Sequence, residues 1–398
     1  MSAVLPSSID AYCAHIHKVA LPVWLSQGYS ERDGLFAERL DFEGRTIGNV
    51  PHRAMVQARQ IYVYSHAALS GIFPAGGDSA LRAMDSLLSR YNDVGDVEKG
   101  LCFSIGRHSD VVSPVRDSYT HAFILLALAT TYHLSGAPRL RNAIEKTTHF
   151  VENRLVDRHF SGLHDQHPPS RKLKSQNPLM HLLEAYLAVH EAWPDGGFLD
   201  RASDIVLHFR RKIWMEDLGV LAEYYHEDWS QLERHSDDAF FEPGHQFEWA
   251  WLLQWYGALS GTDQSAIANA LWASACRYGL KDARLCYDEI SLSMNVRKPS
   301  HRLWPHTEGA KIAAVRAGAG LPDGLPIAKN MASSLNDIFL QRPFEGGWID
   351  RVDGNAQPIV DFVPASSLYH LYSASVALMP LTAREMPEPA KQEDFGVI

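Results

Sequence analysis

The sequence predicts an all-α protein, an (α/α)6 barrel of six inner and six outer helices, with short β-hairpins in the long loops at the end where the candidate functional site lies. Apolar residues recur at helical spacing in twelve segments, and the linkers between these segments alternate between short and long. Six prolines also recur at a nearly constant interval. We therefore expect residues 1–398 to form a single domain.

Helical periodicity covers most of the chain. The segments extend roughly over residues 7–27, 52–71, 77–91, 115–135, 138–155, 178–194, 199–213, 244–260, 264–279, 305–318, 325–340 and 364–379. Twelve helices of this length leave room only for short strands, in the loops.

The linkers show how the helices are grouped. Short, glycine-containing linkers such as LSGAPR, LSGTDQ and AGAGLPDG alternate with long ones that contain the strand-like pieces GLCFSI, GVLAEYY and GGWIDRV. The pattern of helix, short turn, helix and long loop repeats along the chain, which indicates helical hairpins joined by long loops.

A proline marks the start of one helix in each pair, where its fixed φ and missing N–H are tolerated. These prolines stand at positions 51, 114, 178, 243, 305 and 364, with separations of 63, 64, 65, 62 and 59 residues. Six near-equal repeats favour a closed barrel, although the period alone is also compatible with an open solenoid.

The two helices of a pair differ in polarity. The proline-started segments HAFILLALA and EWAWLLQWY are apolar nearly all round, as expected of helices with neighbours on every side. Partners such as APRLRNAIEKTTHFVENRL have a polar face. We therefore assign the proline-started helices to the inner ring.

Composition and charge exclude several classes of partner. The net charge is -10, from 47 acidic and 37 basic residues, and the longest basic run is the short RKLK at 171–174. A nucleic acid partner is not expected, because neutralising phosphates requires clustered cations. No membrane association is expected either, since HAFILLALA is about half as long as a membrane span.

The four cysteines favour a reducing compartment. Cys13, Cys102, Cys276 and Cys286 are far apart and form no CxxC pair. Because the sequence also shows no signal peptide, we expect free thiols and a cytoplasmic protein.

The repeat brings polar residues together at one end of the barrel. If all inner helices begin at the same end, their first two turns converge on one cavity. The residues at these positions combine imidazole, carboxylate, amide, guanidinium and aromatic groups: Arg59, Tyr119, His121, Asn177, His181, His245, Glu248, Trp304, His306, Glu308 and His370. A single histidine near a helix start is usually structural, but the shared phase on six helices indicates a functional site.

Metal, nucleophilic and phosphate-binding chemistry find little support in the motifs. The HxxE pair of His245 and Glu248 supplies two metal ligands, and no HExxH motif adds to them, so we expect no metal and no cofactor. GxSxG, GxGxxG and Walker-A patterns are absent, and no cysteine lies at the converging positions. A glycosidase with Glu248 and Glu308 as facing carboxylates stays open.

Histidine acid–base chemistry fits the candidate residues best. Imidazole can both accept and donate a proton near neutral pH. Glu248, one turn from His245, is expected to orient its ring, and His181 or His370 would supply the second acid–base group. Trp304 and Tyr119 offer flat surfaces to a sugar ring. Proton transfer next to a sugar carbonyl needs only such a surface and the acid–base residues, without a cofactor.

Several sequence blocks resemble the signatures of the N-acylglucosamine 2-epimerase superfamily. They are QAR at 57–59, DSYTHAF at 117–123, NPLMHLLEA at 177–185, PGHQFEWAWLL at 243–253, RLWPHTE at 302–308 and YHL at 369–371. The resemblance covers nearly the whole chain in the right order. It implies an (α/α)6 barrel and a monosaccharide substrate, and it leaves a homodimer open.

The resemblance also implies roles for the candidate residues. His370 would move the proton between C2 and C1 through a cis-enediolate, and His245, with Glu248, would act in ring opening and at the carbonyl oxygen. His181 and Asn177 would hold sugar hydroxyls or assist ring opening. Arg59 would stabilise the enediolate, and Tyr119, Trp304, Glu308 and His121 would complete the substrate pocket.

The reaction subtype follows from one detail of the resemblance. The FEWAW continuation after PGH is similar to the isomerase branch, which implies interconversion of D-mannose and D-fructose. A sugar 2-epimerase is the alternative, and so is a phosphomannose isomerase if RKLK at 171–174 faces the cavity. A non-catalytic sugar-binding scaffold is disfavoured, because His181, His245, Glu248 and His370 are all present.

Overall fold

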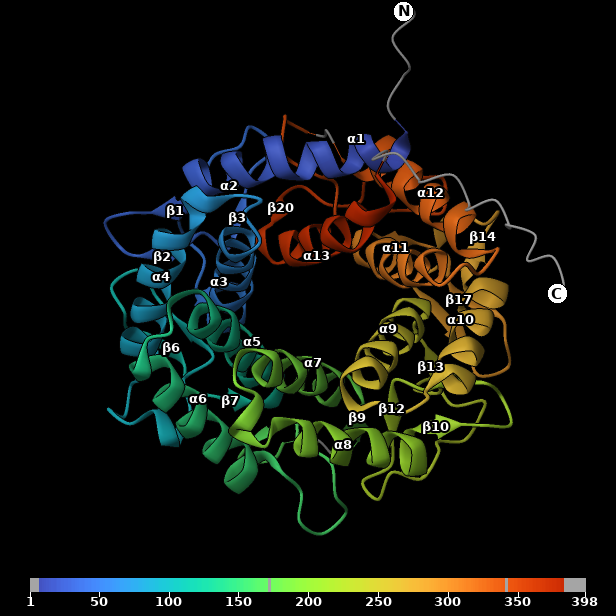
Figure 1. Ribbon diagram of the computed structural model, residues 1–398, viewed down its shortest axis with the longest axis horizontal. Helices are drawn as coiled ribbons and strands as arrows, with labels where there is room; N and C mark the ends of the chain where they lie inside the picture. Colours follow the sequence, from blue (N-terminus) through green and yellow to red (C-terminus); the bar gives the residue numbers. More distant parts are fainter. Residues whose placement is uncertain (1–6, 171–172, 341–342, 383–398) are drawn as a thin grey trace, which may run out of the picture.

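Two concentric rings of helices form the protein in the computed structural model, which describes residues 7–170, 173–340 and 343–382 (Figure 1). The inner ring consists of α3 (Ala54–Leu69), α5 (Ser118–Ser135), α7 (Asn177–Ala192), α9 (Pro243–Ser260), α11 (Leu303–Gly318) and α13 (Leu368–Leu378). Each inner helix contacts the next, and α13 contacts α3, so the ring is closed. The open solenoid is thereby excluded.

The outer ring covers the inner one. It consists of α4 (Gly77–Arg90), α6 (Pro138–Phe150), α8 (Phe198–His208), α10 (Ser265–Gly279), α12 (Gly324–Ser334) and a first helix made of α1 (Ser8–His15), the π-helical turn Ile16–Ala20 and α2 (Leu21–Gly28). This first outer helix packs against α12 and against the last inner helix, α13. The described chain thus contains the twelve predicted helices, in the two predicted rings.

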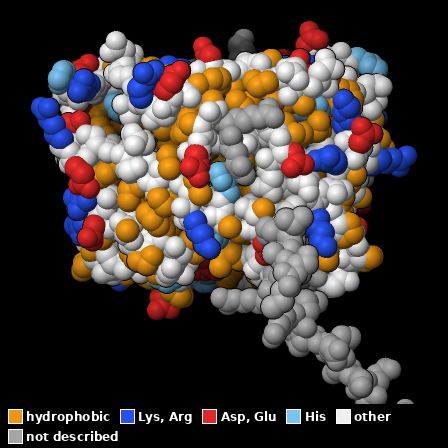
Figure 2. Space-filling model, turned by 90° about the horizontal axis from the view of Figure 1, so that it is seen from above, with side chains coloured by type: hydrophobic (Ala, Val, Ile, Leu, Met, Phe, Trp, Pro, Cys, Tyr) orange, Lys and Arg blue, Asp and Glu red, His pale blue; other side chains and the backbone are white. Residues whose placement is uncertain are grey.

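Burial explains the polarity of the two rings. In α5, every residue from Thr120 to Thr131 is buried, because the helix has the outer ring on one side and the barrel axis on the other. The outer helix α6 alternates buried and exposed positions. Figure 2 looks onto the outer wall on the α1 side and shows acidic and basic side chains interspersed on that face.

In the described part of the chain, the long loops contain twenty strands of two or three residues, as the strand-like pieces predicted. Three hairpins follow outer helices: β1 (Tyr29–Ser30) with β2 (Leu35–Phe36), β10 (Trp214–Met215) with β11 (Val220–Leu221), and β14 (Leu280–Lys281) with β15 (Leu285–Cys286).

The other strands join neighbouring loops into a second ring. A strand just before each inner helix pairs, antiparallel, with the loop that leads to the next one: β4 (His52–Arg53) with β5 (Ser104–Ile105), which also pairs with β6 (Val111–Ser113); β7 (Arg116–Asp117) with β8 (Gln166–His167); β9 (Lys174–Ser175) with β12 (Tyr224–Tyr225); β13 (Phe240–Phe241) with β16 (Glu289–Ser291), which also pairs with β17 (Val296–Lys298); and β18 (His301–Arg302) with β19 (Arg351–Val352). The pairing of β20 (Val363–Pro364) with β3 (Arg39–Leu40) closes this ring.

The packed core lies between the two rings. Trp24 of α2 stacks on Trp348 of the last long loop at 4.6 Å between ring centroids, which ties the first outer helix to the end of the chain. Among the described residues, no helix is long and apolar enough to span a bilayer.

Candidate active site

The N-terminal ends of the inner helices surround a cavity of about 340 Å³, on the side where the long loops pair. Its walls combine helix starts with loop residues: Arg59, Tyr119, Ser175, Asn177, His181, Glu223, Tyr224, Glu242, His245, Glu248, Arg302, Trp304, Asp350, Ser366, Ser367 and His370. Eight of the ten residues that the sequence analysis gave a role line this cavity, and Glu308 contacts His370 from behind.

His121 is not brought to the cavity. Its Nε2 accepts the Leu101 backbone N–H at 3.0 Å and its Nδ1–H donates to the Asp117 carbonyl at 2.7 Å. His306 repeats this arrangement between Cys286 and Arg302, at 2.9 Å on both sides. Since both ring nitrogens of each residue bond to the backbone, these histidines fasten a loop to a helix start, and the predicted substrate contact of His121 is wrong.

His245 is paired with Glu223 rather than with Glu248. Its Nδ1–H donates to Glu223 Oε1 at 2.8 Å, and Glu242 Oε2 lies 3.8 Å away. Burial opposes protonation, but the charge and the hydrogen bond of Glu223 outweigh it and raise the pKa of His245 to about 9. His245 is therefore an imidazolium, a proton donor, at neutral pH.

The prediction that Glu248 orients His245 is wrong for a geometric reason. Side chains on a helix lean toward its N-terminus, so His245 in the first turn of α9 points off the helix end into the loops. Glu223 reaches it there from the loop after β11, and Gln176 Nε2 holds Glu223 through its other oxygen at 3.0 Å. Glu248 lies a turn deeper, 3.8 Å from His181 Nδ1.

His370 has the opposite character. Its Nδ1–H donates to Glu308 Oε1 at 2.8 Å, so the proton is on Nδ1 and Nε2 is the free acceptor. Burial is the largest influence and lowers the pKa of His370 to about 4 despite the bond to Glu308, with Arg59 acting in the same direction as burial. His370 is thus a neutral imidazole, a candidate base, at neutral pH.

His181 forms a third histidine–glutamate pair, within α7. Its Nδ1 lies 3.2 Å from Glu184 Oε2, and the Tyr369 hydroxyl donates to Glu184 Oε1. Burial lowers the pKa of His181 to about 4. The ring contacts Tyr119 edge-on at 5.1 Å.

Glu248 is buried next to this pair. Burial, with the nearby Glu308 charge, raises the pKa of Glu248 well above its usual value, which favours its protonated, uncharged form. The ligand atoms of His181, Glu184 and Glu248 lie within 4.8 Å of one another, which is the spacing of a potential metal site. Both Glu184 oxygens already accept hydrogen bonds from side chains, and these bonds account for its position.

Arg59 supplies a cation to the cavity wall. Its guanidinium donates to the Tyr119 hydroxyl at 2.6 Å and to the Ser366 carbonyl at 3.3 Å, and it lies over the Phe123 ring at 4.2 Å. These contacts fix the guanidinium while leaving its charge facing the cavity.

Trp304 forms the wall that the acid and the base share. Its ring centroid lies 4.8 Å from that of His245 and 5.7 Å from that of His370. Gly244 makes this approach feasible, because a Cβ at that position would lie 2.5 Å from the Trp304 ring. The glycine of the PGH block therefore serves a close contact within the chain.

A comparison with models of protein families identifies the family of this chain. The model described as N-acylglucosamine 2-epimerase (GlcNAc 2-epimerase) matches residues 34–374, well over half of the chain. The chain belongs to the N-acylglucosamine 2-epimerase family. The resemblance seen in the sequence blocks is thereby confirmed.

Relatives within the family are sugar isomerases and epimerases. The chain is 31% identical to a mannose-6-phosphate isomerase of Rhizobium meliloti, over 90% of this chain and 93% of that protein. It is 25% identical to a D-mannose isomerase of Pseudomonas cannabina pv. alisalensis, over 86% and 87%. The structure of cellobiose 2-epimerase from Bacillus thermoamylovorans superposes with a TM-score of 0.83 at 14% identity, over 93% of this chain and 98% of that one.

These findings establish the class of enzyme and the fold. The chain is a sugar isomerase or epimerase of the N-acylglucosamine 2-epimerase family, and the structural match confirms the (α/α)6 barrel. A sugar substrate follows from this membership.

Two basic side chains near the candidate site are already paired with carboxylates and are therefore poorly suited to bind a sugar phosphate. Lys174 of the RKLK segment is buried and donates to Asp157 Oδ2 at 2.5 Å, so it does not face the cavity; Arg171 and Lys172 lie outside the described residues. Arg302 lines the cavity but is paired with Glu242 at 2.8 Å and Asp288 at 3.1 Å.

An adjoining cavity of about 550 Å³ shares Tyr119, Asn177 and Tyr224 with the candidate site. Asp117 and Asp165 line it, and its described lining residues include no lysine or arginine.

Glu223, Glu242 and Asp350 are the acidic cavity residues that the helix pattern could not find, because they lie on loops. The loop sequences do, however, contain a repeated pattern that marks Glu223. Glu223 stands two residues after the buried strand Val220–Leu221, and acids stand at the same place after Leu35–Phe36, Leu285–Cys286 and Trp348. This repeated acid would have marked Glu223 as a partner for a helix-start residue.

Proposed function

We propose that this protein is an aldose–ketose isomerase that interconverts D-mannose and D-fructose by proton transfer through a cis-enediolate. The observation that supports this most directly is the pairing of a protonated His245 with a neutral His370 on one tryptophan wall. One donor and one acceptor of protons, with opposite protonation states at the same pH, are what an enediolate mechanism uses.

The base step belongs to His370 in this proposal. Nε2 of His370 removes the proton from C2 of the open-chain aldose and returns it to C1. Because Nδ1–H is held by Glu308 at 2.8 Å, the ring presents the same nitrogen in both half-reactions. A single base that serves two adjacent carbons gives a ketose.

The acid step belongs to His245. The imidazolium protonates the ring oxygen and takes up the proton of the anomeric hydroxyl as the pyranose opens. It then gives a proton to O1 as the enediolate forms and regains one from O2 as the ketose carbonyl forms. No proton is gained or lost over the cycle. Glu223 keeps the ring charged between turnovers through its 2.8 Å bond.

The remaining cavity residues bind and stabilise. Arg59 is the fixed cation that offsets the negative charge of the enediolate oxygens. Asn177 Oδ1 is buried in the cavity wall and has no hydrogen-bond partner among the described residues, which suits it to accept from a sugar hydroxyl. His181 and the neutral Glu248 supply further donors and acceptors on the same wall.

A free sugar fits the described site better than a sugar phosphate. Arg302 is neutralised by two carboxylates, the adjoining cavity has aspartates, and Lys174 is buried in its own ion pair. A phosphate prefers an excess of arginine or lysine donors. The name of the Rhizobium meliloti relative nevertheless makes mannose 6-phosphate the second substrate to test.

The deciding experiment follows the reaction by NMR in heavy water. D-Mannose, D-fructose, D-glucose, N-acetylmannosamine and mannose 6-phosphate are incubated separately with the enzyme. We expect fructose from mannose, with deuterium at C1. Glucose formed from mannose without fructose would replace the isomerase by a 2-epimerase, and turnover confined to mannose 6-phosphate would make the enzyme a phosphomannose isomerase.

Two controls accompany this experiment. The His370→Asn variant should lose the exchange of the C2 proton, and full exchange in this variant would remove the proposed base. Pretreatment with a chelator should leave the rate unchanged. A loss that zinc restores would instead assign a metal to His181, Glu184 and Glu248.

A further inference from the structure

Lys311 is a fully buried cation one helical turn after Glu308 on α11. Its relative exposure is 1%, and its Nζ lies 2.8 Å from Glu308 Oε2. The other oxygen of the same carboxylate, Oε1, accepts the Nδ1–H of His370 at 2.8 Å. Lysine, glutamate and histidine therefore form a chain of contacts that ends at the proposed base.

We propose that Lys311 is a positioning residue of the active site, which, by pairing with Glu308, keeps that carboxylate the acceptor of the His370 Nδ1 proton and so leaves Nε2 free as the base. This inference deepens the proposed function and rests on it for the role of His370. Lys311 does not line the cavity, so it acts through Glu308 rather than on the sugar.

The surroundings of Glu308 explain why a cation is needed. The carboxylate is fully buried, and Glu184 and Glu248 are near enough to influence Lys311 as well. Other titratable groups around the chain of contacts are His181 on α7, Tyr369 on α13, Arg59 on α3 and Tyr12 on α1. Three glutamates share this small volume. The hydrogen bond from His181 favours the ionised form of Glu184, and the Lys311 charge favours that of Glu308.

The proton distribution agrees with this arrangement. Burial alone would raise the pKa of Glu308, but the Lys311 charge and the His370 bond bring it down to about 2. Burial would lower the pKa of Lys311, but the Glu308 charge raises it instead. The pair is therefore ionised throughout the neutral range, while Glu248, farther from the lysine, takes up a proton.

Removing the lysine would change the tautomer of His370. Without the cation, the buried Glu308 would bind a proton and donate it to Nδ1 of His370. The ring proton would then move to Nε2, and the atom that faces C2 would no longer accept a proton. The loss would be greatest at low pH and would reverse where Glu308 ionises again.

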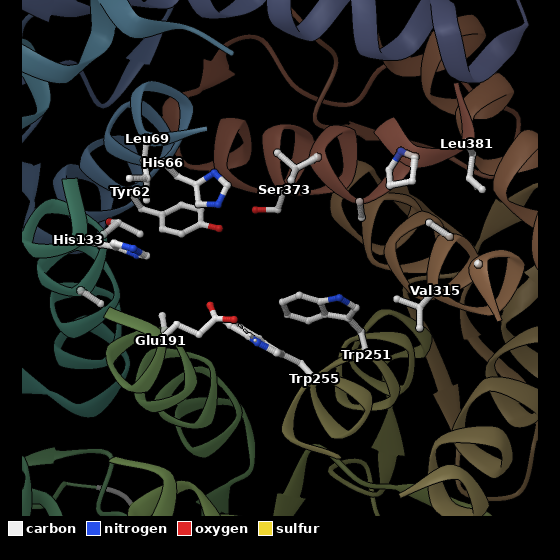
Figure 3. Close-up of a pocket in the computed structure, with 18 residues that line it drawn as sticks. Tyr62, His66, Leu69, His133, Glu191, Trp251, Trp255, Val315, Ser373 and Leu381 are labelled. Carbon is white, nitrogen blue, oxygen red and sulfur yellow. Dashed lines mark hydrogen bonds between the residues drawn. The ribbon is translucent and has the colours of Figure 1, made fainter. Parts of the chain in front are cut away.

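Trp251 holds Lys311 from the opposite side. The Lys311 Nζ lies over the Trp251 ring at 3.7 Å from its centroid, a cation–π contact. Trp251 is also part of the wall of a second cavity of about 520 Å³ at the C-terminal ends of the inner helices, where Figure 3 shows it beside Trp255 and across from Tyr62. The tryptophan thus separates the lysine from the far opening of the barrel.

The test compares Lys311→Met with Lys311→Arg through the pH dependence of kcat/KM. The methionine keeps the length and removes the charge, so its acid limb should move up by about one pH unit or more while KM changes little. The arginine keeps the charge and should hold the limb in place. Lys298→Met, which removes an exposed lysine that pairs with the buried Glu289, is the matched control and should behave as wild type.

A second readout reports on the tautomer directly. In ¹⁵N NMR spectra, His370 of the wild type should show a protonated Nδ1 and a bare Nε2 from pH 5 to 8, and Lys311→Met should show protonated Nε2. A folded Lys311→Met enzyme with an unchanged acid limb and a bare Nε2 would overturn the proposal. If this variant does not fold, a wild-type ¹³C spectrum with a protonated Glu308 carboxyl at pH 7 would overturn it instead.

The outcome does not depend on the identity of the sugar. If the wild type converts a sugar other than mannose, the proposed substrate is wrong, and the same profile is measured with the sugar that reacts. The NMR readout needs no substrate at all. Failure of the proposed function and failure of the role of Lys311 are therefore separate results.

Discussion

Replacing Glu223 by glutamine should convert His245 from a charged to a neutral imidazole. Glutamine keeps the shape of the side chain, and its Oε1 still accepts the Nδ1–H of His245, while its Nε2 gives up the bond that Glu223 Oε2 accepts from Gln176. What changes is the negative charge 2.8 Å from the ring. Since burial opposes protonation of His245, removing that charge leaves the pKa of the ring to fall from about 9 to the ordinary 6.5 or below.

The size of the effect follows from the two pKa values. The proposed acid is active only when protonated, so kcat/KM is lost as pH rises through the pKa of His245. The base is active only when deprotonated, so activity is lost as pH falls through the pKa of His370, near 4. The wild type should show a bell with limbs near pH 4 and pH 9. In Glu223→Gln the alkaline limb should move to about pH 6.5 or lower, which at pH 8 is roughly a 30-fold loss of kcat/KM.

The assay is the rate of ketose formation from pH 3.5 to 10, with circular dichroism as a check of folding. Glu38→Gln is the matched control, because Glu38 occupies the same place in another loop but bonds Arg53 instead of a histidine. An alkaline limb that stays near pH 9 in a folded Glu223→Gln enzyme would refute the assignment of Glu223 as the group that charges His245.

Two further variants test the cavity wall. Gly244→Ala places a Cβ 2.5 Å from the Trp304 ring, so Trp304 should be displaced. We expect KM to rise about tenfold and the free energy of unfolding in urea to fall by about 1–3 kcal/mol. Gly48→Ala is the control, because a Cβ there would have no atom within 4 Å, and it should change neither quantity. Glu248→Gln replaces a neutral acid by a neutral amide, so the alkaline limb should stay at its wild-type pH; a downward shift would restore Glu248 as the partner of His245.

The fold was predictable because each copy of its repeat has features that can be recognised within a single segment of the sequence. A proline near each inner-helix start and an apolar surface all round the helix are properties of single segments, and they identify six helix pairs and assign them to rings. The ring of loop strands was not predictable to the same degree. Strands of two residues have no measurable period, and the pairing of β20 with β3 joins segments more than three hundred residues apart.

The same distinction between local and tertiary features separates the site residues that the sequence predicted from those that it did not. Arg59, Asn177, His245 and His370 were located because helix starts converge when the barrel closes. The partner of His245 was misassigned because the rule that residues three apart share a helix face applies within a helix. At the first turn the ring leaves the helix and meets Glu223, whose position depends on tertiary structure.

Three histidine–glutamate pairs of similar geometry have different charges because of the groups that surround them. His245 lies near a second carboxylate, Glu242, at 3.8 Å, and the added negative charge favours the imidazolium. His181 and His370 share the influence of the Arg59 guanidinium, and the Lys311 charge adds to it at His370. Burial lowers the pKa of all three rings, and only at His245 do the surrounding carboxylates outweigh it, so identical side chains divide into bases and an acid. The division comes from the charged residues next to each ring, with Glu223, Glu242 and Arg59 in the cavity wall and Lys311 behind it. A relative with the same histidines but other charges around them would therefore distribute its protons differently.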